Sequence, residues 1–179
     1  MRSRESRTPV TRFGLTSMST DIRVLTWIVL ALPLGLALGA SPARVPIRAV
    51  LLVVLAVVIV LYASVWLFWR PTAFEVDARG GLRILWPLRV RTIPAGEIAE
   101  AVVLSREAFH REFGWGMRIG AGGLWGGFGW LYTAKGLLGL HVSRTDRLVL
   151  VRLRTGRPLL VTPEDDERFV AALRAVSRG

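Results

Sequence analysis

Residues 49–69 read AVLLVVLAVVIVLYASVWLFW, an apolar run without a charged side chain. An α-helix rises about 1.5 Å per residue, so about 20 residues cross a hydrocarbon core of about 30 Å. A second run, VLTWIVLALPLGLALGASPA at 24–43, is similarly long and also uncharged. Two buried core helices of a soluble protein are the alternative, but such helices rarely lack charge on every face. The sequence therefore predicts two membrane-spanning helices, at 24–43 and 49–69.

The two runs are joined by a short segment, Ser41–Arg48, in which Pro42 and Pro46 interrupt the helix. We therefore predict a tight antiparallel hairpin over residues 24–69. Aromatic side chains gather at the end of the second run, and such side chains are enriched at the headgroup level of a bilayer. The expected membrane-interface anchors are Trp66, Trp69 and Arg70.

The arginines indicate how the hairpin is oriented, because cytoplasmic segments carry an excess of positive charge. Five arginines precede the first run, and Arg70, Arg79 and Arg83 follow the second, whereas the turn holds only Arg44 and Arg48. Of the 24 basic residues all but one are arginine, a usage typical of GC-rich bacterial genomes. We predict a multi-pass protein of the bacterial cell (inner) membrane with both termini in the cytoplasm.

Residues 1–23 form a basic leader that we expect to be disordered. Two alternatives concern this end of the chain and stay open. Residues 37–39, Ala-Leu-Gly, resemble a small-residue cleavage site for a signal peptide. Met18 is a second possible start, which would remove most of the leader.

The formal net charge of +11 favours anionic partners. Beside a bilayer, each basic residue near the surface contributes about 1 kcal/mol of attraction to anionic headgroups. Nucleic acid is the rival partner, but no recognised motif is present and the charge is not concentrated on one predicted helix. We therefore expect the lipid bilayer, and a protein partner or a second copy of the chain, but no nucleic acid. The chain has no cysteine, which excludes disulfides and thiolate chemistry.

Residues 70–179 are expected to form one domain, because short segments of alternating apolar and polar residues dominate there. The alternation is typical of antiparallel sheets with one solvated face, and glycine-rich or polar turns separate the segments. We predict about seven strands, counting some irregular strand structure in the middle of the domain. The clearest segments are 74–78, 82–86, 89–93, 98–104, 138–143, 147–154 and 157–161.

A helix is expected at the C-terminal end of this domain. Thr162 is the predicted N-cap, with Pro163 at the first helical position and four acidic residues in the first turn. Phe169, Leu173 and Val176 form one apolar stripe. The predicted fold class is α+β: a transmembrane hairpin, then a small, mainly antiparallel β-barrel capped by this helix.

Glycine and aromatic residues are interleaved in an insert at 114–139, which holds 10 of the 18 glycines. Three interpretations stay open. Glycines at bulges and tight bends, with tryptophans filling the core, would be structural. Alternatively the insert contacts the bilayer surface, or it forms a groove for a peptide or small ligand.

The element order, the Gly-Trp-Gly-Met-Arg element at 114–118 and the segment Pro158–Leu173 resemble bacterial pleckstrin-homology-like (PH-like) membrane proteins. The resemblance covers residues 74–176. It implies a curved antiparallel barrel closed at one end by the terminal helix, no enzymatic activity and roles such as scaffolding and self-assembly. Pleckstrin domains that bind phosphoinositides use a basic cluster in the first hairpin. Here that hairpin has only Arg79 and Arg83, so inositol-lipid recognition is not expected.

The expected function is therefore a membrane-anchored, non-enzymatic PH-like interaction or assembly module that faces the cytoplasm. An accessory subunit of a transporter or secretion complex is the alternative, in which Gly35 and Gly39 would allow close helix approach. His110 and His141 show no spacing typical of a catalytic or metal site, and no cofactor is expected. The residues expected to contact headgroups or partners are Arg83, Arg89, Arg91, Trp115, Arg118, Trp125, Phe128 and Trp130.

Overall fold

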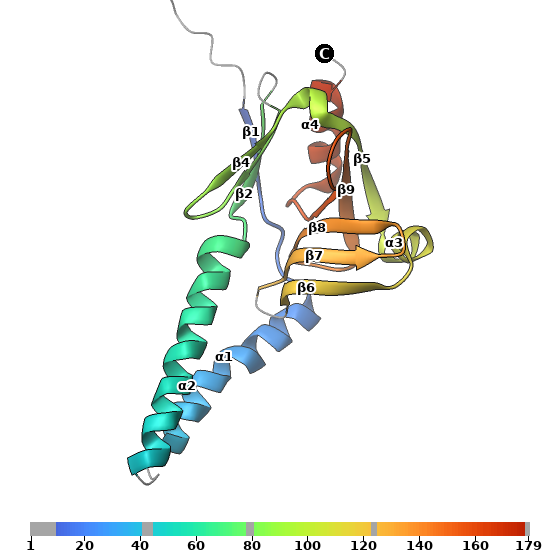
Figure 1. Cartoon of the computed structure of the whole chain (residues 1–179). Coiled ribbons are helices and arrows are strands. Elements are labelled where there is room, and N and C mark those ends of the chain that lie inside the picture. The colour runs from blue at the N-terminus through green and yellow to red at the C-terminus, as the bar shows by residue number, and fades with distance from the viewer. Residues whose placement is uncertain (1–9, 41–44, 78–80, 123–124, 178–179) are drawn as a thin grey trace, which may run out of the picture.

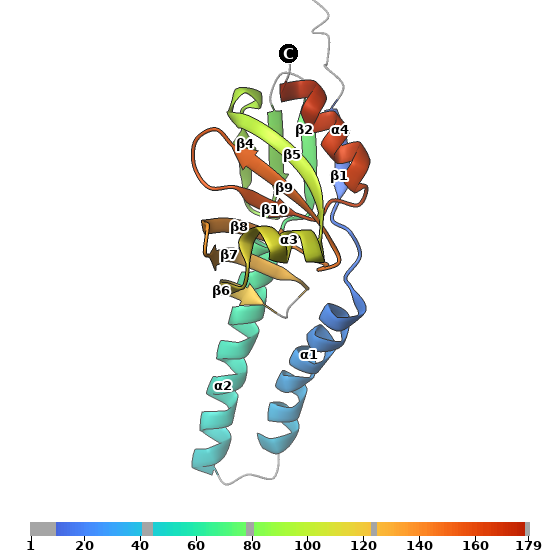
Figure 2. The ribbon, with the colours of Figure 1, turned by 90° about the vertical axis from the view of Figure 1, so that its right-hand side faces the viewer.

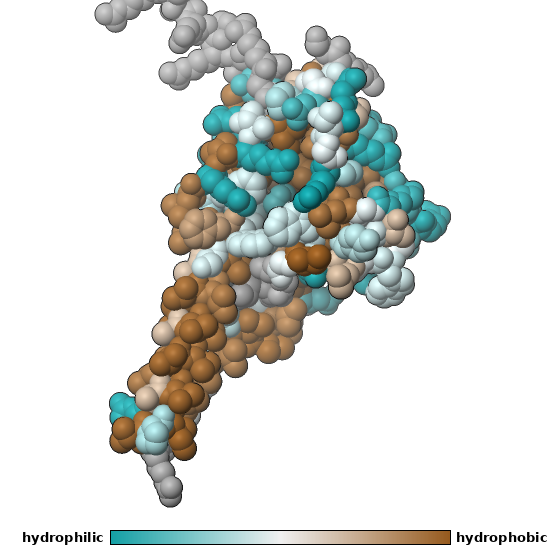
Figure 3. Space-filling model, viewed as in Figure 1, coloured by the Kyte–Doolittle hydropathy of each residue, from teal (hydrophilic) through white to brown (hydrophobic). Residues whose placement is uncertain are grey.

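Two long helices lead into a two-sheet domain in the computed structural model, which describes residues 10–40, 45–77, 81–122 and 125–177 (Figure 1). Helix α1 spans Thr20–Ala40, and α2 spans Val45–Ser64 and continues as a π-helical turn, Val65–Trp69. Both helices are long and apolar enough to cross a membrane, and almost none of their surface is buried within the molecule. Figure 3 shows hydrophobic side chains along both helices, whereas the domain surface is mixed.

The helices form an antiparallel hairpin, so that the start of α1 and the end of α2 lie at the same end, beside the domain (Figure 2). The hydroxyl of Tyr62 in α2 donates a hydrogen bond to the backbone carbonyl of Val29 in α1. Pro33 lies inside α1, a position that membrane helices tolerate better than soluble ones. The expected connecting turn lies largely in 41–44, outside the described residues.

The first sheet contains four antiparallel strands in the order β1-β2-β3-β4. Its first strand comes from the segment before the helices, and Phe13 in it is buried against the core. The expected disorder of the leader is therefore wrong for this part, because Phe13 pairs with Phe74 and gains a buried apolar site. The strands are Val10–Gly14, Ala73–Asp77, Gly81–Leu85 and Val90–Ile93.

The second sheet contains six strands in the order β5-β9-β10-β8-β7-β6. All its neighbours are antiparallel except β10 and β8, which are parallel. A 3₁₀ turn, Ala95–Glu97, leads from the first sheet to the second. The strands are Ile98–Ser105, Gly116–Gly122, Gly127–Thr133, Gly136–Val142, Arg147–Leu153 and Leu159–Val161, numbered β5 to β10 along the chain.

The expected closed barrel of about seven strands is corrected to two open sheets with ten described strands. Seven strands lie where the alternation predicts them, and β1, β6 and β7 are additional. No pairing joins β4 to β5 among the described residues, because the 3₁₀ turn separates them and each is the edge of its own sheet.

The main core lies between the first sheet, β5, β9, β10 and helix α4, Asp166–Ser177. A second cluster lies under helix α3, Arg106–Phe113, which begins at an N-cap provided by the Ser105 side chain. Fully buried side chains of the main core include Phe74, Leu82, Ile84, Val149, Leu159, Phe169 and Leu173.

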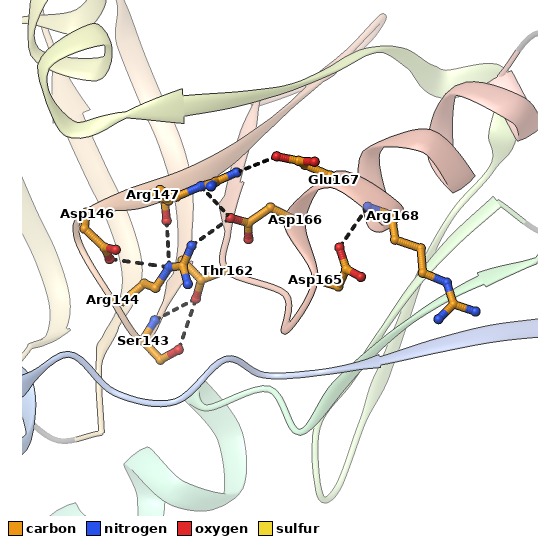
Figure 4. A network of polar contacts seen from close by, with 9 residues as sticks. All are labelled: Ser143, Arg144, Asp146, Arg147, Thr162, Asp165, Asp166, Glu167 and Arg168. Carbon is orange, nitrogen blue, oxygen red and sulfur yellow. Dashed lines mark hydrogen bonds and ion pairs between the residues drawn. The ribbon is translucent and has the colours of Figure 1, made fainter.

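Helix α4 begins at Asp166, three residues later than the expected first helical position, Pro163, and Thr162 is not its N-cap. The carboxylate of Asp165 accepts a hydrogen bond of 3.0 Å from the backbone N–H of Arg168 and caps the helix instead (Figure 4). Thr162 is fully buried, and its hydroxyl accepts from the backbone N–H of Ser143 at 2.9 Å. The Thr162 hydroxyl therefore accepts a tertiary hydrogen bond from Ser143 and does not cap the helix.

Two of the four acidic residues expected to serve the helix dipole, Asp166 and Glu167, form tertiary ion pairs, and Glu167 lies 3.1 Å from Nη2 of Arg147. The Asp166 carboxylate is buried and lies 2.7 Å from Nη2 of Arg144 and 3.2 Å from Nε of Arg147 (Figure 4). These ion pairs fix the start of α4 to the β8–β9 connection, through Arg144, and to the first residue of β9, Arg147.

Candidate functional site

The glycine and tryptophan insert forms the junction between the domain and the end of the second helix. Gly120 of β6 pairs with Gly129 of β7, and both have positive φ, 133° and 125°. A Cβ atom at these positions would lie 3.1 Å and 3.0 Å from Cζ3 of Trp69. The Trp69 ring therefore packs directly on the sheet backbone, which only glycine permits. Its edge also contacts Trp130, with ring centroids 5.7 Å apart.

The segment before β7 contacts both helices. The backbone N–H of Trp125 donates to the Thr26 hydroxyl of α1 at 3.0 Å, and the Trp125 ring packs edge-on against Trp66 at 4.8 Å. Trp125 is a non-glycine residue with positive φ, 56°, so the backbone conformation here is strained. These contacts hold the start of α1 and the end of α2 against the same part of the second sheet.

The expected anchors Trp66, Trp69 and Arg70 lie at this junction. The Arg70 guanidinium lies over the Trp66 ring, 4.4 Å from its centroid. Burial lowers the pKa of Arg70. The indole N–H of Trp86, at the end of β3, donates to the backbone carbonyl of Trp69 at 3.1 Å. The first sheet therefore also touches the end of α2.

A cleft of about 480 Å³ opens where the two sheets part, and we call it the junction cleft. Trp86, Arg89, Val90 and Arg91, from the β3–β4 connection and β4, form one wall. Gly129, Trp130, Gly139 and His141 of β7 and β8 form the opposite wall, and Phe68 and Trp69 close it at the helix end. Strand alternation explains the second wall, because Trp130 pairs with Gly139, and His141 lies two residues further on the same face.

His141 is the buried polar residue of this cleft. Its ring packs edge-on against Trp86 at 5.3 Å, and its Nδ1 has no hydrogen-bond partner among the described residues. Burial, and then the positive charges of Arg91 and Arg89, lower the pKa of His141 from 6.5 to about 4. The imidazole is therefore neutral at pH 7.

The arginines give the cleft its positive charge. The Arg89 guanidinium lies 4.3 Å from the centroid of the Trp86 ring, so it stacks on the cleft wall. Arg91 pairs with Ile84 across β3 and β4 and so lies on the core-facing side of the first sheet. No carboxylate is among the described lining residues.

The structure brings only some of the expected contact residues together. Arg89, Arg91 and Trp130 line the junction cleft, whereas Arg83 pairs with Glu75 of the neighbouring strand at 3.2 Å. Trp115 and Arg118 line a separate hollow of about 220 Å³ beside α3. Phe128 is fully buried, so its side chain is not available to a headgroup or partner.

The outcome for the insert is mixed. The structural interpretation is confirmed for glycines at close approaches and positive φ, but the tryptophans do not fill the core. Trp125 and Trp130 contact the end of α2, and Trp115 is 91% exposed.

Sequence reasoning missed Phe68, Trp86 and His141 as members of a site. In the sequence, Trp86 only ends a predicted strand, and His141 has no catalytic or metal-binding spacing. No group of three metal-ligating side chains occurs in the described ranges.

The comparisons with known proteins bear on the domain. Residues 75–177 match a family model described as a bacterial PH domain, which covers more than half of the chain. The match confirms the resemblance noted from the sequence. It includes the junction cleft except for Phe68 and Trp69, and it leaves out β1. The search of the curated proteins found no match.

Proposed function

This chain belongs to the bacterial PH domain family, and from that membership and its two apolar helices we propose a membrane-anchored, non-enzymatic interaction or assembly module that faces the cytoplasm. PH domains are in general non-catalytic modules for protein or lipid interaction. The helices supply the anchor, and the domain supplies the interaction surface. The proposed location is the bacterial inner membrane, with both chain termini in the cytoplasm.

The pairing of β1 with β2 supports a common side for the two ends of the chain. Strand β1 precedes the helices and β2 follows them, yet both belong to one sheet. If α1 and α2 cross a bilayer, the segment from Val10 and the whole PH domain lie on the same side of it. The arginine excess on that side favours the cytoplasm.

One observation carries the proposal: an exposed apolar face on the β6–β7 hairpin, next to the helix ends. The cross-strand pairs Met117–Tyr132 and Ile119–Trp130 lie on one face of these strands. Met117 and Tyr132 are 64% and 58% exposed, and Ile119 and Trp130 are 46% and 40% exposed. We call these four residues the hairpin face. A contiguous exposed apolar surface of this kind marks an interaction site.

Crosslinking in native membranes tests this proposal. The full chain is crosslinked, purified and compared with the variant Met117→Ser/Tyr132→Ser. We expect a discrete crosslinked species with wild-type protein and its loss in the variant, because two large apolar contacts are removed. The matched control is Val10→Ser/Leu88→Ser, which changes two exposed apolar side chains outside the hairpin face. A species that persists in the variant, or that disappears in the control as well, contradicts the assigned surface.

An accessory subunit of a transporter or secretion complex is the second candidate, and one observation favours it. A Cβ atom at Gly35 or Gly39 of α1 would meet no atom within 4 Å. The hairpin itself does not use this small-residue face, which leaves it open to a helix of a larger membrane protein. Gly35→Leu/Gly39→Leu reduces the size of the complex in mild detergent if this candidate is correct, and an unchanged size rejects it.

A further inference from the structure

The junction cleft lies at the depth where a bilayer would present its headgroups. Phe68 and Trp69 close the cleft, and they are the last residues of the apolar stretch Val45–Trp69. The end of an apolar helix with aromatic side chains is placed at the bilayer–water interface. A lipid in the leaflet nearest the domain can therefore reach the cleft without leaving the membrane.

Two arginines in the cleft have no acidic partner within the part of the chain that the structure describes. Arg89 and Arg91 are exposed and form no ion pair with a carboxylate among the described residues. Four arginines of the domain, Arg83, Arg144, Arg147 and Arg152, have carboxylate partners, whereas no carboxylate is among the described residues that line the cleft. Guanidinium groups hold phosphate oxygens with paired, charge-assisted hydrogen bonds. Two guanidiniums in a cleft whose described lining residues include no carboxylate favour a phosphate that carries net negative charge.

The buried histidine offers a third polar group. The Nδ1 atom of His141 is buried and has no hydrogen-bond partner in the described segments, although an unsatisfied buried polar atom costs about 1–3 kcal/mol. A neutral imidazole can either donate a hydrogen bond or accept one, according to its tautomer. The glycerol or ester portion of a bound molecule would supply the missing partner.

The rest of the cleft is apolar and large enough for a small molecule. Phe68, Val90 and Trp130 are 47%, 50% and 40% exposed, and Trp130 continues into the hairpin face. Small-molecule sites have volumes of about 300–1,000 Å³ with apolar walls and a few polar groups, and the junction cleft matches this description. An acyl chain fits such walls better than a free soluble anion does.

We propose that the junction cleft binds one anionic glycerophospholipid, with its phosphate between Arg89 and Arg91 and its apolar part against Phe68 and Trp130. The assignment rests on the proposed function, because it needs the helices in a bilayer. A zwitterionic lipid is disfavoured, since its ammonium group would approach two arginines and find no carboxylate.

This site is separate from the first hairpin of the domain. The β2–β3 connection follows Asp77, which pairs with Gly81. The arginines of the cleft lie at the opposite ends of β3 and β4, where Leu85 pairs with Val90. The cleft also needs Phe68 and Trp69 from the helix, so the domain alone does not complete it.

Lipid titration of the full chain tests the inference. Protein in dodecyl maltoside micelles is titrated with phosphatidylglycerol or phosphatidylcholine of identical acyl chains, and bound lipid is counted by native mass spectrometry. We expect one phosphatidylglycerol to bind at least tenfold more tightly than phosphatidylcholine. Arg89→Gln/Arg91→Gln abolishes this preference, because both phosphate ligands are removed, and both side chains are exposed.

The matched control is Arg154→Gln/Arg157→Gln, which removes the same charge at exposed arginines outside the cleft and keeps the tenfold preference. Equal binding of the two lipids overturns the inference, as does an equal loss in control and variant. If inorganic phosphate at the same concentration as phosphatidylglycerol displaces the lipid, the cleft binds a soluble phosphate and the inference is overturned. Recovery of the chain with the membrane fraction is measured in parallel. A chain that is absent from the membrane fraction rejects the proposed function and not merely the lipid site.

Discussion

Two glycines determine how closely the second helix approaches the second sheet. Gly120 and Gly129 lie opposite one another, and a Cβ at Gly129 would lie 2.5 Å from the Ile119 carbonyl oxygen and 3.0 Å from the Trp69 ring. Neither contact can be relieved by a flexible side chain alone, because one partner is backbone and the other is a packed indole. The glycines thus serve the junction as well as the strands.

Gly129→Ala tests this role, with Gly136→Ala as the matched control. Gly136 belongs to the same sheet and also has positive φ, 110°, but a Cβ there meets nothing within 4 Å. We expect Gly136→Ala to lower the free energy of unfolding by about 1 kcal/mol, the cost of the backbone conformation alone. Gly129→Ala should cost about 3 kcal/mol or more, since steric overlap is added to that strain.

The measurement is thermal or urea unfolding in detergent, followed by tryptophan fluorescence. Equal losses of stability in the two variants would show that Gly129 is needed only for its backbone conformation and that the close contact with Trp69 is unimportant.

His141 predicts a dependence of stability on pH. Its pKa falls from 6.5 to about 4 on folding, so the unfolded chain binds a proton between these values and the folded chain does not. Above pH 6.5 His141 is neutral in both states and does not lower the free energy of unfolding. As the pH falls from 6.5 toward 4, this free energy decreases by up to about 3 kcal/mol.

We compare wild-type protein with His141→Gln at pH 7.5 and pH 5 to isolate this group, because other titrating side chains contribute equally to both proteins. The loss of unfolding free energy between the two pH values should be larger in the wild type. A loss of the same size in both proteins would mean that His141 is accessible to protons in the folded state.

At the scale of elements, β1 ties the segment before the helices to the domain that follows them. Phe13 is 4% exposed and packs edge-on against Phe169 of α4, with ring centroids 5.2 Å apart. The strand thereby adds a core side chain from outside the residues matched as a PH domain. A chain that began at Met18, or that lost its first helix by cleavage, would lack this strand.

Phe13→Ala measures what the strand contributes. Large-to-small changes of a buried phenylalanine cost about 3–5 kcal/mol, so we expect about 3 kcal/mol at this edge strand. Arg12→Ala, at the exposed neighbouring position, should change the free energy of unfolding by less than about 0.5 kcal/mol. If deletion of residues 1–17 left the unfolding temperature unchanged, β1 would not be part of the stable fold.

The elements also show which parts of the fold can be predicted from sequence. Strands β2–β5 and β8–β10 were predicted because apolar and polar side chains alternate in them. Strands β6 and β7 were less visible, since glycines such as Gly120, Gly127 and Gly129 have no side chain with which to alternate. Strand β1 was missed because its partner, β2, lies on the other side of both helices in the sequence.

The site was predictable only in part, because it depends on contacts between elements that are distant in the sequence. Arg89 and Arg91 were expected to contact headgroups or partners from their charge and position. Their meeting with His141 and Phe68 depends on how two sheets and a helix end pack, which alternation within one strand does not encode. The closed barrel failed as an expectation because edge pairing between β4 and β5 is likewise a non-local property.

At the scale of the whole molecule, the helices and the domain form one docked unit. Trp69 packs on the second sheet, Trp86 hydrogen-bonds to the end of α2, and Trp125 hydrogen-bonds to Thr26 of α1. The orientation of the domain relative to the helices is therefore specified by contacts and not only by the covalent connection. In a bilayer this arrangement would hold the junction cleft and the hairpin face at a constant depth.

The absence of cysteine makes the sidedness of this unit directly measurable. Single variants Ser41→Cys, between the helices, and Thr155→Cys, between β9 and β10, are expressed in bacterial cells, and spheroplasts are treated with a membrane-impermeant maleimide. The account predicts labelling of Ser41→Cys in intact spheroplasts and labelling of Thr155→Cys only after lysis. Labelling of Thr155→Cys in intact spheroplasts, or protection of Ser41→Cys until lysis, would contradict a membrane hairpin that holds the PH domain in the cytoplasm.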